Sequence, residues 1–282
     1  MGWQLTRAVA EFSAEAGEFL LADRCSNTVL LTVTETLRVA GTIPSAADVS
    51  PLFGWWRADG GAVRGAFLHT PPYHVLLTAM PPEAGAELAG LLAADGRALA
   101  GVNGEEETAN AFAGIWRDRT GRDARVFRRN RLFRLARLAW PEPRPDGLAR
   151  LATAGDRDLL IEWFDAFSRD VGEPGSGSAG AVDDRLGYGG ITIWEAAGQP
   201  VSLAALSRRV AGMVRVGPVY TPTALRGRGY AGGATSAVSQ AALDAGATDV
   251  LLFTDLANPT SNALYQRLGY RAVEDRLMLS FG

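Results

Sequence analysis

A glycine-rich stretch near the end of the chain has the residue types and spacing to hold a diphosphate. Residues 225–233 read LRGRGYAGG and precede an alanine-rich segment of helical character. A helix N-terminus exposes backbone N–H groups without partners and carries a partial positive charge, and glycines before it let phosphate oxygens approach the backbone. The stretch therefore predicts a phosphate-binding loop, with an ordinary glycine-rich turn as the alternative.

One interpretation of these letters is a dinucleotide-binding fingerprint. Gly227, Gly229 and Gly232 have its spacing, and Asp255 follows the next expected strand, where an acid could bind a ribose hydroxyl. In that fold the loop turns directly out of its strand, but Pro222 interrupts the approach here. The 282 residues also leave only 50 after Gly232, which is too few for a doubly wound sheet. Both observations weigh against a dinucleotide.

The other interpretation is an acyl-CoA pyrophosphate loop. VYTPTALRGRGYAGGATSAV (219–238) contains Arg226-x-x-Gly229-x-Ala231, and it resembles motif A of the GNAT (GCN5-related N-acetyltransferase) superfamily. ANPTSNALYQRLGYRAV (257–273) resembles the second diagnostic stretch of that family, an Asn-led helix that carries Leu-Tyr and ends in Gly-Tyr. The resemblance covers roughly residues 147–282, and the ordered pair of motifs is more specific than either alone.

The resemblance implies a set of residues that bind acetyl-CoA. The strand before the loop would pair its free backbone groups with pantetheine amides, the loop amides would hold the pyrophosphate, and an asparagine-led helix would contact the pantetheine arm. Small residues after Gly229 would let the cofactor and a neighbouring strand approach the first helical turn. The implied cofactor-binding residues are Val219, Tyr220, Thr221, Arg226, Gly227, Arg228, Gly229, Tyr230, Ala231, Asn258 and Asn262. Asn258 also has the position of a helix cap.

Tyr265 is the general acid that the resemblance implies, because family members use a tyrosine here to protonate the departing CoA thiolate. A phenol of pKa near 10 is a plausible donor to a thiolate of similar basicity. Its alternative role is that of a core aromatic on an amphipathic helix. For the general base, Glu195 is the first candidate by analogy, with Glu162, Glu173, Asp255 or a chain of waters as alternatives.

The composition excludes several other chemistries. No lysine occurs, and all 28 basic residues are arginine. A Walker A loop, a pyridoxal Schiff base and the usual kinase strand all need a lysine. Cys25 is the only cysteine, which excludes an intramolecular disulfide and a thiolate-rich zinc site. His69 and His74 flank a TPPY turn and are interpreted as turn and strand-edge residues, so the expected reaction uses no metal.

Charge and hydropathy indicate a globular protein of the cytoplasm. The net charge of −3 argues against a nucleic-acid or anionic-membrane partner. No run approaches 18 apolar residues, and the N-terminus lacks the pattern of a secretory signal. The expected chain is a monomer or a homodimer.

The spacing of apolar residues predicts two copies of one α/β domain, each a mixed sheet flanked by helices. WPEPRPDG (140–147) reads as a linker. The expected division is a degenerate GNAT-like domain at 1–140, a linker at 141–147 and a catalytic domain at 148–282. The expected order is α-α-β-β-β-α-β-α-β in the first half, with an uncertain strand before it, and the same order in the second.

The function implied is direct transfer of an acetyl group from acetyl-CoA to an amine of a small molecule or a peptide. The first half lacks the Arg-x-x-Gly-x-Ala loop and is expected to bind no CoA; it would shape the acceptor pocket or pack structurally. Trp55, Trp56 and Tyr73 could line such a pocket, with at least one of them expected to pack in the core instead. The alternatives are a non-catalytic acyl-CoA sensor, an enzyme for a longer or charged acyl group, and a dinucleotide-binding protein.

Overall fold

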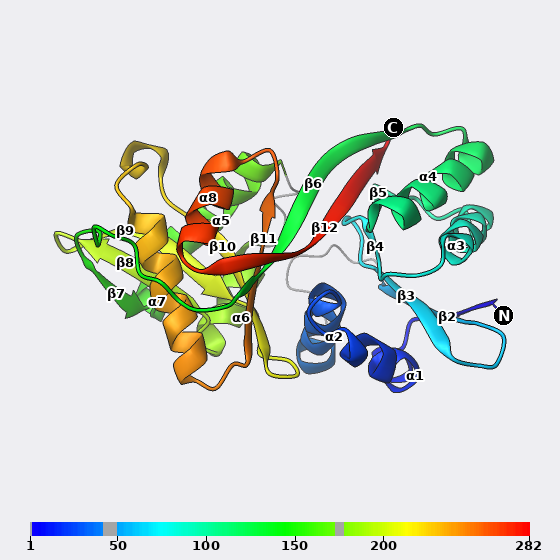
Figure 1. The fold of residues 1–282 in the computed structure, drawn as a ribbon, viewed down its shortest axis with the longest axis horizontal. Coiled ribbons are helices and arrows are strands. Elements are labelled where there is room, and N and C mark those ends of the chain that lie inside the picture. Colours follow the sequence, from blue (N-terminus) through cyan, green and yellow to red (C-terminus); the bar gives the residue numbers. More distant parts are fainter. Residues whose placement is uncertain (1, 42–49, 173–177) are drawn as a thin grey trace.

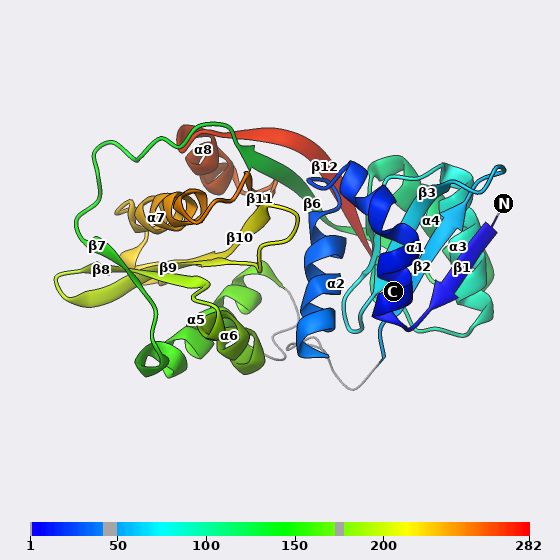
Figure 2. The ribbon, with the colours of Figure 1, turned by 90° about the horizontal axis from the view of Figure 1, so that it is seen from below.

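Residues 2–41, 50–172 and 178–282 are described in the computed structural model of the chain. Within these ranges all strands form one mixed sheet, in the order β1-β2-β3-β4-β5-β12-β6-β11-β10-β9-β8-β7. Figure 1 shows the two halves of the chain side by side, joined at the centre by the long strands β6 and β12. Helices cover both faces of the sheet in each half, as Figure 2 shows.

The first half has the element order that the periodicity predicts, and the uncertain first strand is present. Its strands are β1 (Gly2–Thr6), β2 (Leu52–Arg57), β3 (Val63–His69), β4 (Val75–Leu77), β5 (Gly101–Gly104) and β6 (Ala124–Leu135). Its helices are α1 (Val9–Ala22), α2 (Thr28–Ala40), α3 (Pro82–Ala94) and α4 (Glu106–Thr120).

The second half repeats this order with two short 3-10 turns added. Its strands are β7 (Leu148–Leu151), β8 (Ile191–Ala196), β9 (Gln199–Leu206), β10 (Met213–Tyr220), β11 (Asp249–Asp255) and β12 (Tyr270–Phe281). Its helices are α5 (Arg157–Val171), α6 (Ser178–Gly187), α7 (Tyr230–Asp244) and α8 (Pro259–Arg267), with 3-10 turns at Ala154–Asp156 and Thr223–Leu225. The expected α/β architecture with two tandem copies is therefore confirmed.

The two halves exchange their last strands, which the sequence pattern did not predict. β6 ends the first half but pairs with β11 of the second, from Leu251↔Arg134 to Asp255↔Asn130. β12 ends the second half but pairs with β5 of the first. β6 and β12 also pair with each other along most of their length. Neither half has a complete sheet without the other, and the division at 140–147 remains a prediction about the chain.

Buried apolar residues form clusters on both faces of the sheet, and one cluster joins the halves. Phe12 and Leu20 of α1 pack in the same cluster as Met213 and Leu251 of the second half. Hydrophobic burial of this kind is the dominant stabilising term in folding. The apolar layer under α1 and α2 therefore continues from the first half into the second.

The tryptophans expected to line an acceptor pocket are core residues instead. Trp55 and Trp56 are each 3% exposed, and they point to opposite faces of β2 because side chains alternate along a strand. Trp55 packs with the α1 and α2 layer, and Trp56 packs with the α3 and α4 layer. The expectation that they line a pocket is wrong, because both faces of this strand are covered.

Asp249 provides a polar tie between the halves. This carboxylate at the start of β11 is 1% exposed. Arg24 and Arg134, both from the first half, place guanidinium nitrogens 2.7 Å and 2.6 Å from its oxygens. A buried carboxylate needs such partners to be stable, so this contact fixes the position of β11 relative to α1 and β6.

His69 makes the stability of the fold depend on pH. It is 1% exposed at the end of β3, and Arg97 Nε donates to its Nδ1 at 2.8 Å. Burial, followed by the charge of Arg97, lowers the pKa of His69 to about 4. The unfolded chain takes up this proton near pH 6.5. The contribution of neutral His69 to the free energy of unfolding is therefore fully present above about pH 6.5 and is lost as the pH falls toward 4.

Between pH 7 and pH 4.5, the free energy of unfolding of the parent should fall by about 2 kcal/mol more than that of the His69→Gln variant. Glutamine keeps an oxygen that can accept from Arg97 but cannot take up a proton. Urea unfolding followed by circular dichroism at both pH values measures the difference. Equal pH dependence in the two proteins would contradict the assignment.

No helix in the described ranges has the length and apolar character to cross a membrane.

Burial raises the pKa of the Cys25 thiol, so this side chain stays protonated and weakly nucleophilic at neutral pH.

Candidate active site

Strands β10 and β11 separate at their carboxyl ends. They are parallel and pair from Met213↔Asp249 to Val216↔Leu252. Beyond Val216, β10 shifts register and stays with β9, whereas β11 stays with β6 as far as Asp255. The resemblance implied this separation, and ligands of open α/β sheets bind at the carboxyl ends of parallel strands.

The peptide groups of Val219 face the opening between the strands. The carbonyl of Tyr220 accepts a hydrogen bond from Ser202 Oγ of β9 at 2.8 Å, so it points away from β11. Because successive residues of a strand direct their peptide groups to opposite sides, those of Val219 point toward β11, which has no paired residue there. A ligand amide could complete this edge as an added strand would.

The glycine loop forms an anion-binding nest. Gly227 and Gly229 have φ values of 79° and 81°, in the left-handed region that favours glycine. Gly229 caps α7, and the first hydrogen bond of the helix runs from Gly233 N to Gly229 O. Across the described part of the chain, the amides of residues 227–232 have no hydrogen-bond acceptor. Successive free amides after left-handed residues, at a helix N-terminus, suit a phosphate.

The two arginines of the loop have different surroundings. Arg226 donates to the carbonyl of Thr221 at 3.0 Å and to Asp170 of α5 at 2.5 Å, so it closes the loop and ties it to α5. This contact also occupies the carbonyl of Thr221, one of the residues expected to bind the cofactor. Arg228 is exposed, and no described residue pairs with it. Arg228 is therefore the loop cation available to a phosphate.

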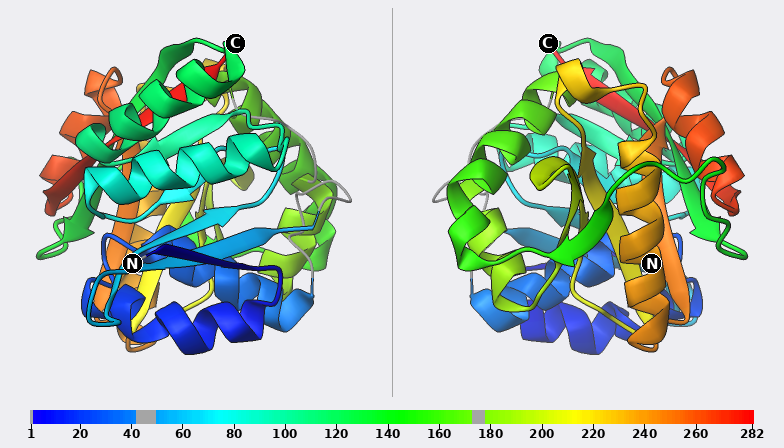
Figure 3. Two further views of the ribbon diagram at one scale, coloured as in Figure 1. Left: turned by 90° about the vertical axis from the view of Figure 1, so that its right-hand side faces the viewer. Right: turned by 90° about the vertical axis from the view of Figure 1, so that its left-hand side faces the viewer.

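Gly232 and Gly233 lie in the first turn of α7, where the linker passes over the helix (Figure 3). A Cβ at Gly233 would lie 3.0 Å from Pro145 Cγ and 2.9 Å from Trp194 Cε2, so a side chain has no room there. A Cβ at Gly232 would lie 3.3 Å from Leu264 Cδ1 of α8 and in ordinary contact with Pro141. The sequence predicted that these small residues leave room for the cofactor and a neighbouring strand, whereas the structure fills the space beside Gly233 with the linker and Trp194 of β8.

Asn258 and Asn262 organise the start of α8. The side chain of Asn258 accepts from Ser261 N at 3.0 Å, which confirms its capping role. Asn262 Nδ2 donates to the carbonyls of Asp255 and Asn258 at 2.7 Å each, which joins α8 to the end of β11. Asn262 Oδ1 is buried without a partner among the described residues. Contact of either residue with a cofactor remains a prediction.

Tyr265 lies in the cluster that also contains Val219 and Tyr230. It is 8% exposed, on the side of α8 that faces the sheet. Burial raises its pKa to about 12, so the phenol keeps its proton at neutral pH. The Tyr270 ring contacts it edge-on at 6.1 Å. The structure therefore places the expected acid in the buried layer between α8 and the sheet, in the cluster that includes Val219 of β10.

Glu195 lies apart from this group. It is on β8, two strands away from β10, and its carboxylate accepts from Arg150 Nε at 2.8 Å. Arg150 also holds Asp156 through both of its terminal nitrogens. Glu195 is thus part of an ion-pair network at the outer edge of the sheet, and its role as a base remains a prediction that this position does not favour.

Of the alternative bases, Asp255 is nearest the opening. It ends β11, and its Oδ1 accepts from Ala257 N at 2.8 Å. Glu162 is exposed on α5, and Glu173 lies outside the described residues. No group of three or more His, Cys, Asp or Glu side chains in the described part of the chain is placed to hold a metal ion.

Arg128 of the first half contacts the end of β11 and the end of α5, and Phe127 beside it lies near the end of α5; sequence reasoning missed both residues. Arg128 Nε lies 3.7 Å from the Asp255 carboxylate, and Arg128 also donates to the carbonyl of Val171 at the end of α5. Phe127 Cζ lies 4.0 Å from the Cβ position of Gly172. These residues reach the site only because β6 pairs with β11, so no local pattern identifies them.

Comparison with known proteins agrees with the order of the elements. A family model described as FR47-like protein matches residues 197–279, which include the glycine loop and α8. No curated protein matches the chain. The fold is similar to a GCN5-related N-acetyltransferase from Sphaerobacter thermophilus, with 18% identity, a TM-score of 0.62 and coverage of 98% of this chain and 94% of that one.

The arrangement of two copies is also found in a solved structure. A tandem GNAT protein from the clavulanic acid biosynthesis pathway matches over 99% of this chain and 98% of its own, with a TM-score of 0.57 and 14% identity. The chain is a GNAT-fold protein with two tandem copies. An acetyltransferase of the GNAT family from Colwellia psychrerythraea also matches over 100% of this chain and 99% of its own, at 11% identity and a TM-score of 0.57.

The first GNAT copy lacks the nest of the second. Its equivalent helix, α3, follows Pro81 and starts at Pro82, and neither residue has an N–H to offer. The amides of Ala84 and Gly85 are both bonded to the Pro81 carbonyl. The GNAT loop that can bind a diphosphate through its backbone is therefore the one before α7.

Proposed function

We propose that the chain is an acyl-CoA-dependent N-acetyltransferase that moves an acetyl group from acetyl-CoA to an amine. One observation carries the proposal: the free amides of residues 227–232 lie next to the separated ends of β10 and β11. A diphosphate site and an open strand edge at one end of a sheet suit a ligand with a pyrophosphate and an amide-containing arm. Acetyl-CoA has both.

The residues present fit this ligand. The nest before α7 would hold the pyrophosphate, with the exposed Arg228 of the same loop adding positive charge. The C=O of Val219 would accept a hydrogen bond from a pantetheine amide across the opening. Asn258, whose Oδ1 caps α8, has its amide nitrogen left to donate to the same arm. When bound, acetyl-CoA supplies the activated acetyl group.

The chemistry needs one donor to the thioester oxygen and one proton for the leaving thiolate. In the proposed transfer the neutral amine attacks the thioester carbonyl directly, and the N–H of Val219 or a neighbour stabilises the developing oxyanion. The carbon–sulfur bond then breaks, and Tyr265 gives its proton to the thiolate. The amine loses a proton in the same reaction, to Asp255 or through water.

The amine would approach from the side where the two halves meet. The end of α5, which carries Asp170 and Val171, borders the opening there, and Arg128 connects it to Asp255 of β11. Trp163 of α5 contacts the Tyr220 ring at 5.9 Å. In this proposal the first half contributes to the acceptor site through β6, and the acceptor is a small-molecule or peptide amine.

Release of free thiol from acetyl-CoA, measured over a panel of small amines and peptide N-termini, tests the proposal. We expect release that depends on the amine, with one acetylated amine per thiol. Tight binding of acetyl-CoA without amine-dependent release would favour a sensor. Turnover of propionyl- or succinyl-CoA in preference to acetyl-CoA would point to a different acyl group. An acetyl-CoA-bound structure with the ligand on the first half would contradict the site.

A further inference from the structure

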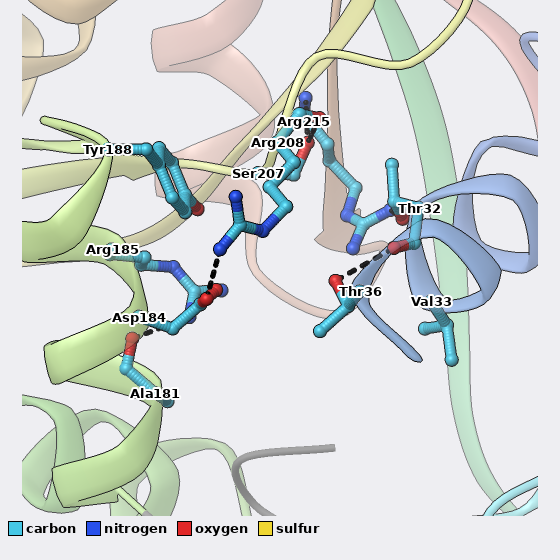
Figure 4. A pocket seen from close by; sticks show the side chains of 10 residues that line it. All are labelled: Thr32, Val33, Thr36, Ala181, Asp184, Arg185, Tyr188, Ser207, Arg208 and Arg215. Atoms are coloured by element: carbon cyan, nitrogen blue, oxygen red, sulfur yellow. Dashed lines mark hydrogen bonds and ion pairs between the residues drawn. The ribbon is translucent and has the colours of Figure 1, made fainter. Parts of the chain in front are cut away.

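A cavity between the two halves is lined by three arginines. Its volume is about 150 Å³, and it lies between α2, α6 and the β9–β10 connection. Figure 4 shows Arg185 on α6, with Arg208 and Arg215 directed into the space that faces Thr32 and Thr36 of α2. The cavity is distinct from the nest before α7, since the two share no residue.

The cavity has more positive than negative charge. Asp184 is the only carboxylate that lines it in the described ranges, and it pairs with Arg208. Arg185 and Arg215 have no carboxylate partner among the described residues. Glu35 lies near Arg208 from α2 but is itself paired with Arg38. Three guanidiniums against one carboxylate leave an excess of about two positive charges.

The arginines that line the cavity are incompletely hydrogen-bonded. Nε of Arg185 and Nε of Arg208 have no partner in the described part of the chain, although both atoms are buried rather than open to the cavity, and Arg185 also donates to the carbonyl of Ala181 at 3.0 Å. Arg215 donates to Thr32 Oγ1 at 2.9 Å, across the boundary between the halves. Burial, followed by the charge of Arg185, lowers the pKa of Arg215 to about 10, and it remains charged at neutral pH. Buried charges and donors without partners are costly.

We propose that this cavity binds a small dianion of the phosphate class. The excess charge matches a phosphate dianion, whereas a single carboxylate would leave part of it uncompensated. The cavity, with a volume of about 150 Å³, is large enough for a phosphate ion. Guanidiniums from three positions line the space, and a tetrahedral oxyanion can accept charge-assisted hydrogen bonds from several directions at once.

The bound anion would hold the halves together. It would connect α2 of the first half to α6 and β10 of the second, in the same region where Thr32 and Arg215 already meet. A ligand that binds only the folded chain raises its apparent stability. This inference does not depend on the proposed acetyl transfer, because it involves none of the residues assigned to acetyl-CoA.

Calorimetric titration of the full chain with inorganic phosphate, in a buffer free of phosphate and sulfate, tests the site. We expect saturable binding and a rise of several degrees in the unfolding midpoint. Arg185→Met should weaken binding at least tenfold. The matched control is Arg209→Met, which removes an exposed arginine beside the cavity and should keep the parental affinity. Gly229→Glu, which blocks the nest before α7, should also keep phosphate binding at the cavity.

Thr36→Glu tests the site by adding a negative charge to the cavity instead of removing a positive one. The carboxylate would enter the cavity from α2 and replace the anion, so we expect a higher unfolding midpoint without phosphate and no further rise with it. Absence of phosphate binding to the parent chain, or binding lost in Gly229→Glu and kept in Arg185→Met, would overturn the proposal. If Arg185→Met does not fold, a Thr36→Glu chain with parental phosphate affinity would also overturn it.

Parallel titrations identify the form of the anion. Binding of glycerol 3-phosphate as tightly as phosphate would indicate a phosphate monoester whose organic part lies at the mouth of the cavity. Binding of phosphate but not of glycerol 3-phosphate would indicate the inorganic ion. Malonate that binds where phosphate does not would overturn the phosphate class.

Discussion

Gly229→Glu is expected to abolish the binding of acetyl-CoA. Gly229 has a φ of 81°, which a residue with a side chain adopts only with strain. Its Cβ position lies 3.3 Å from Pro145 Cβ, so the new side chain must turn toward the nest. The glutamate would place a negative charge where the pyrophosphate binds, and a like-charge contact costs several kcal/mol. We therefore expect affinity to fall by roughly 100-fold or more, measured by calorimetric titration with acetyl-CoA.

The matched control is Gly246→Glu. Gly246 follows the opposite end of α7, has a φ of 84° and is exposed. The two variants carry a similar backbone strain and the same added charge, so thermal unfolding of Gly246→Glu measures what these two changes cost away from the nest. Only Gly229→Glu should lose acetyl-CoA. A Gly229→Glu chain with parental affinity would contradict the loop assignment.

Tyr265→Phe is expected to lower kcat by about 100-fold while leaving the KM for acetyl-CoA nearly unchanged. General acid catalysis contributes about 10²- to 10⁴-fold, and phenylalanine keeps the packing of this buried ring. Because burial raises the pKa of Tyr265 to about 12, the phenol is protonated throughout the neutral range. Its ionisation would therefore reduce activity only as the pH approaches 12. Initial rates with a saturating amine, from pH 6 to pH 10, test both statements.

Tyr270→Phe is the control for loss of a buried hydroxyl. Tyr270 contacts Tyr265, but its hydroxyl lies 2.7 Å from Ser239 Oγ. Its removal should cost about 1 kcal/mol of stability and leave kcat close to the parental value. A Tyr265→Phe variant with the parental kcat would show that Tyr265 is not the general acid. An equal loss of kcat in Tyr265→Phe and Tyr270→Phe would indicate a packing effect.

The elements and the motif pair could be predicted because their signals are local. The apolar spacing of 157–171 predicts α5, and Asn258-Pro259 predicts the start of α8. A helix period or a cap is read within a few residues, so the structure reproduces these features. The order of elements in both halves follows from the same kind of signal.

The surroundings of individual site residues could not be predicted in this way. Arg226 has the family position of a loop cation, yet its guanidinium binds Thr221 and Asp170. Gly233 looks like a glycine kept for a ligand, yet Pro145 of the linker occupies the space. In both cases the deciding partner lies far away in the chain, and spacing along the chain does not encode which distant side chain arrives.

The sequence by itself determined the two-copy α/β order and the single nest-forming loop, because glycines, caps and periodic apolar positions act within one or two turns of backbone. Only the tertiary structure decided that β6 and β12 change places, that Arg128 of the first half reaches the opening of the second, and that three arginines meet α2 in one cavity. These outcomes depend on strand register and layer packing between distant segments, where each contact is set by all the others.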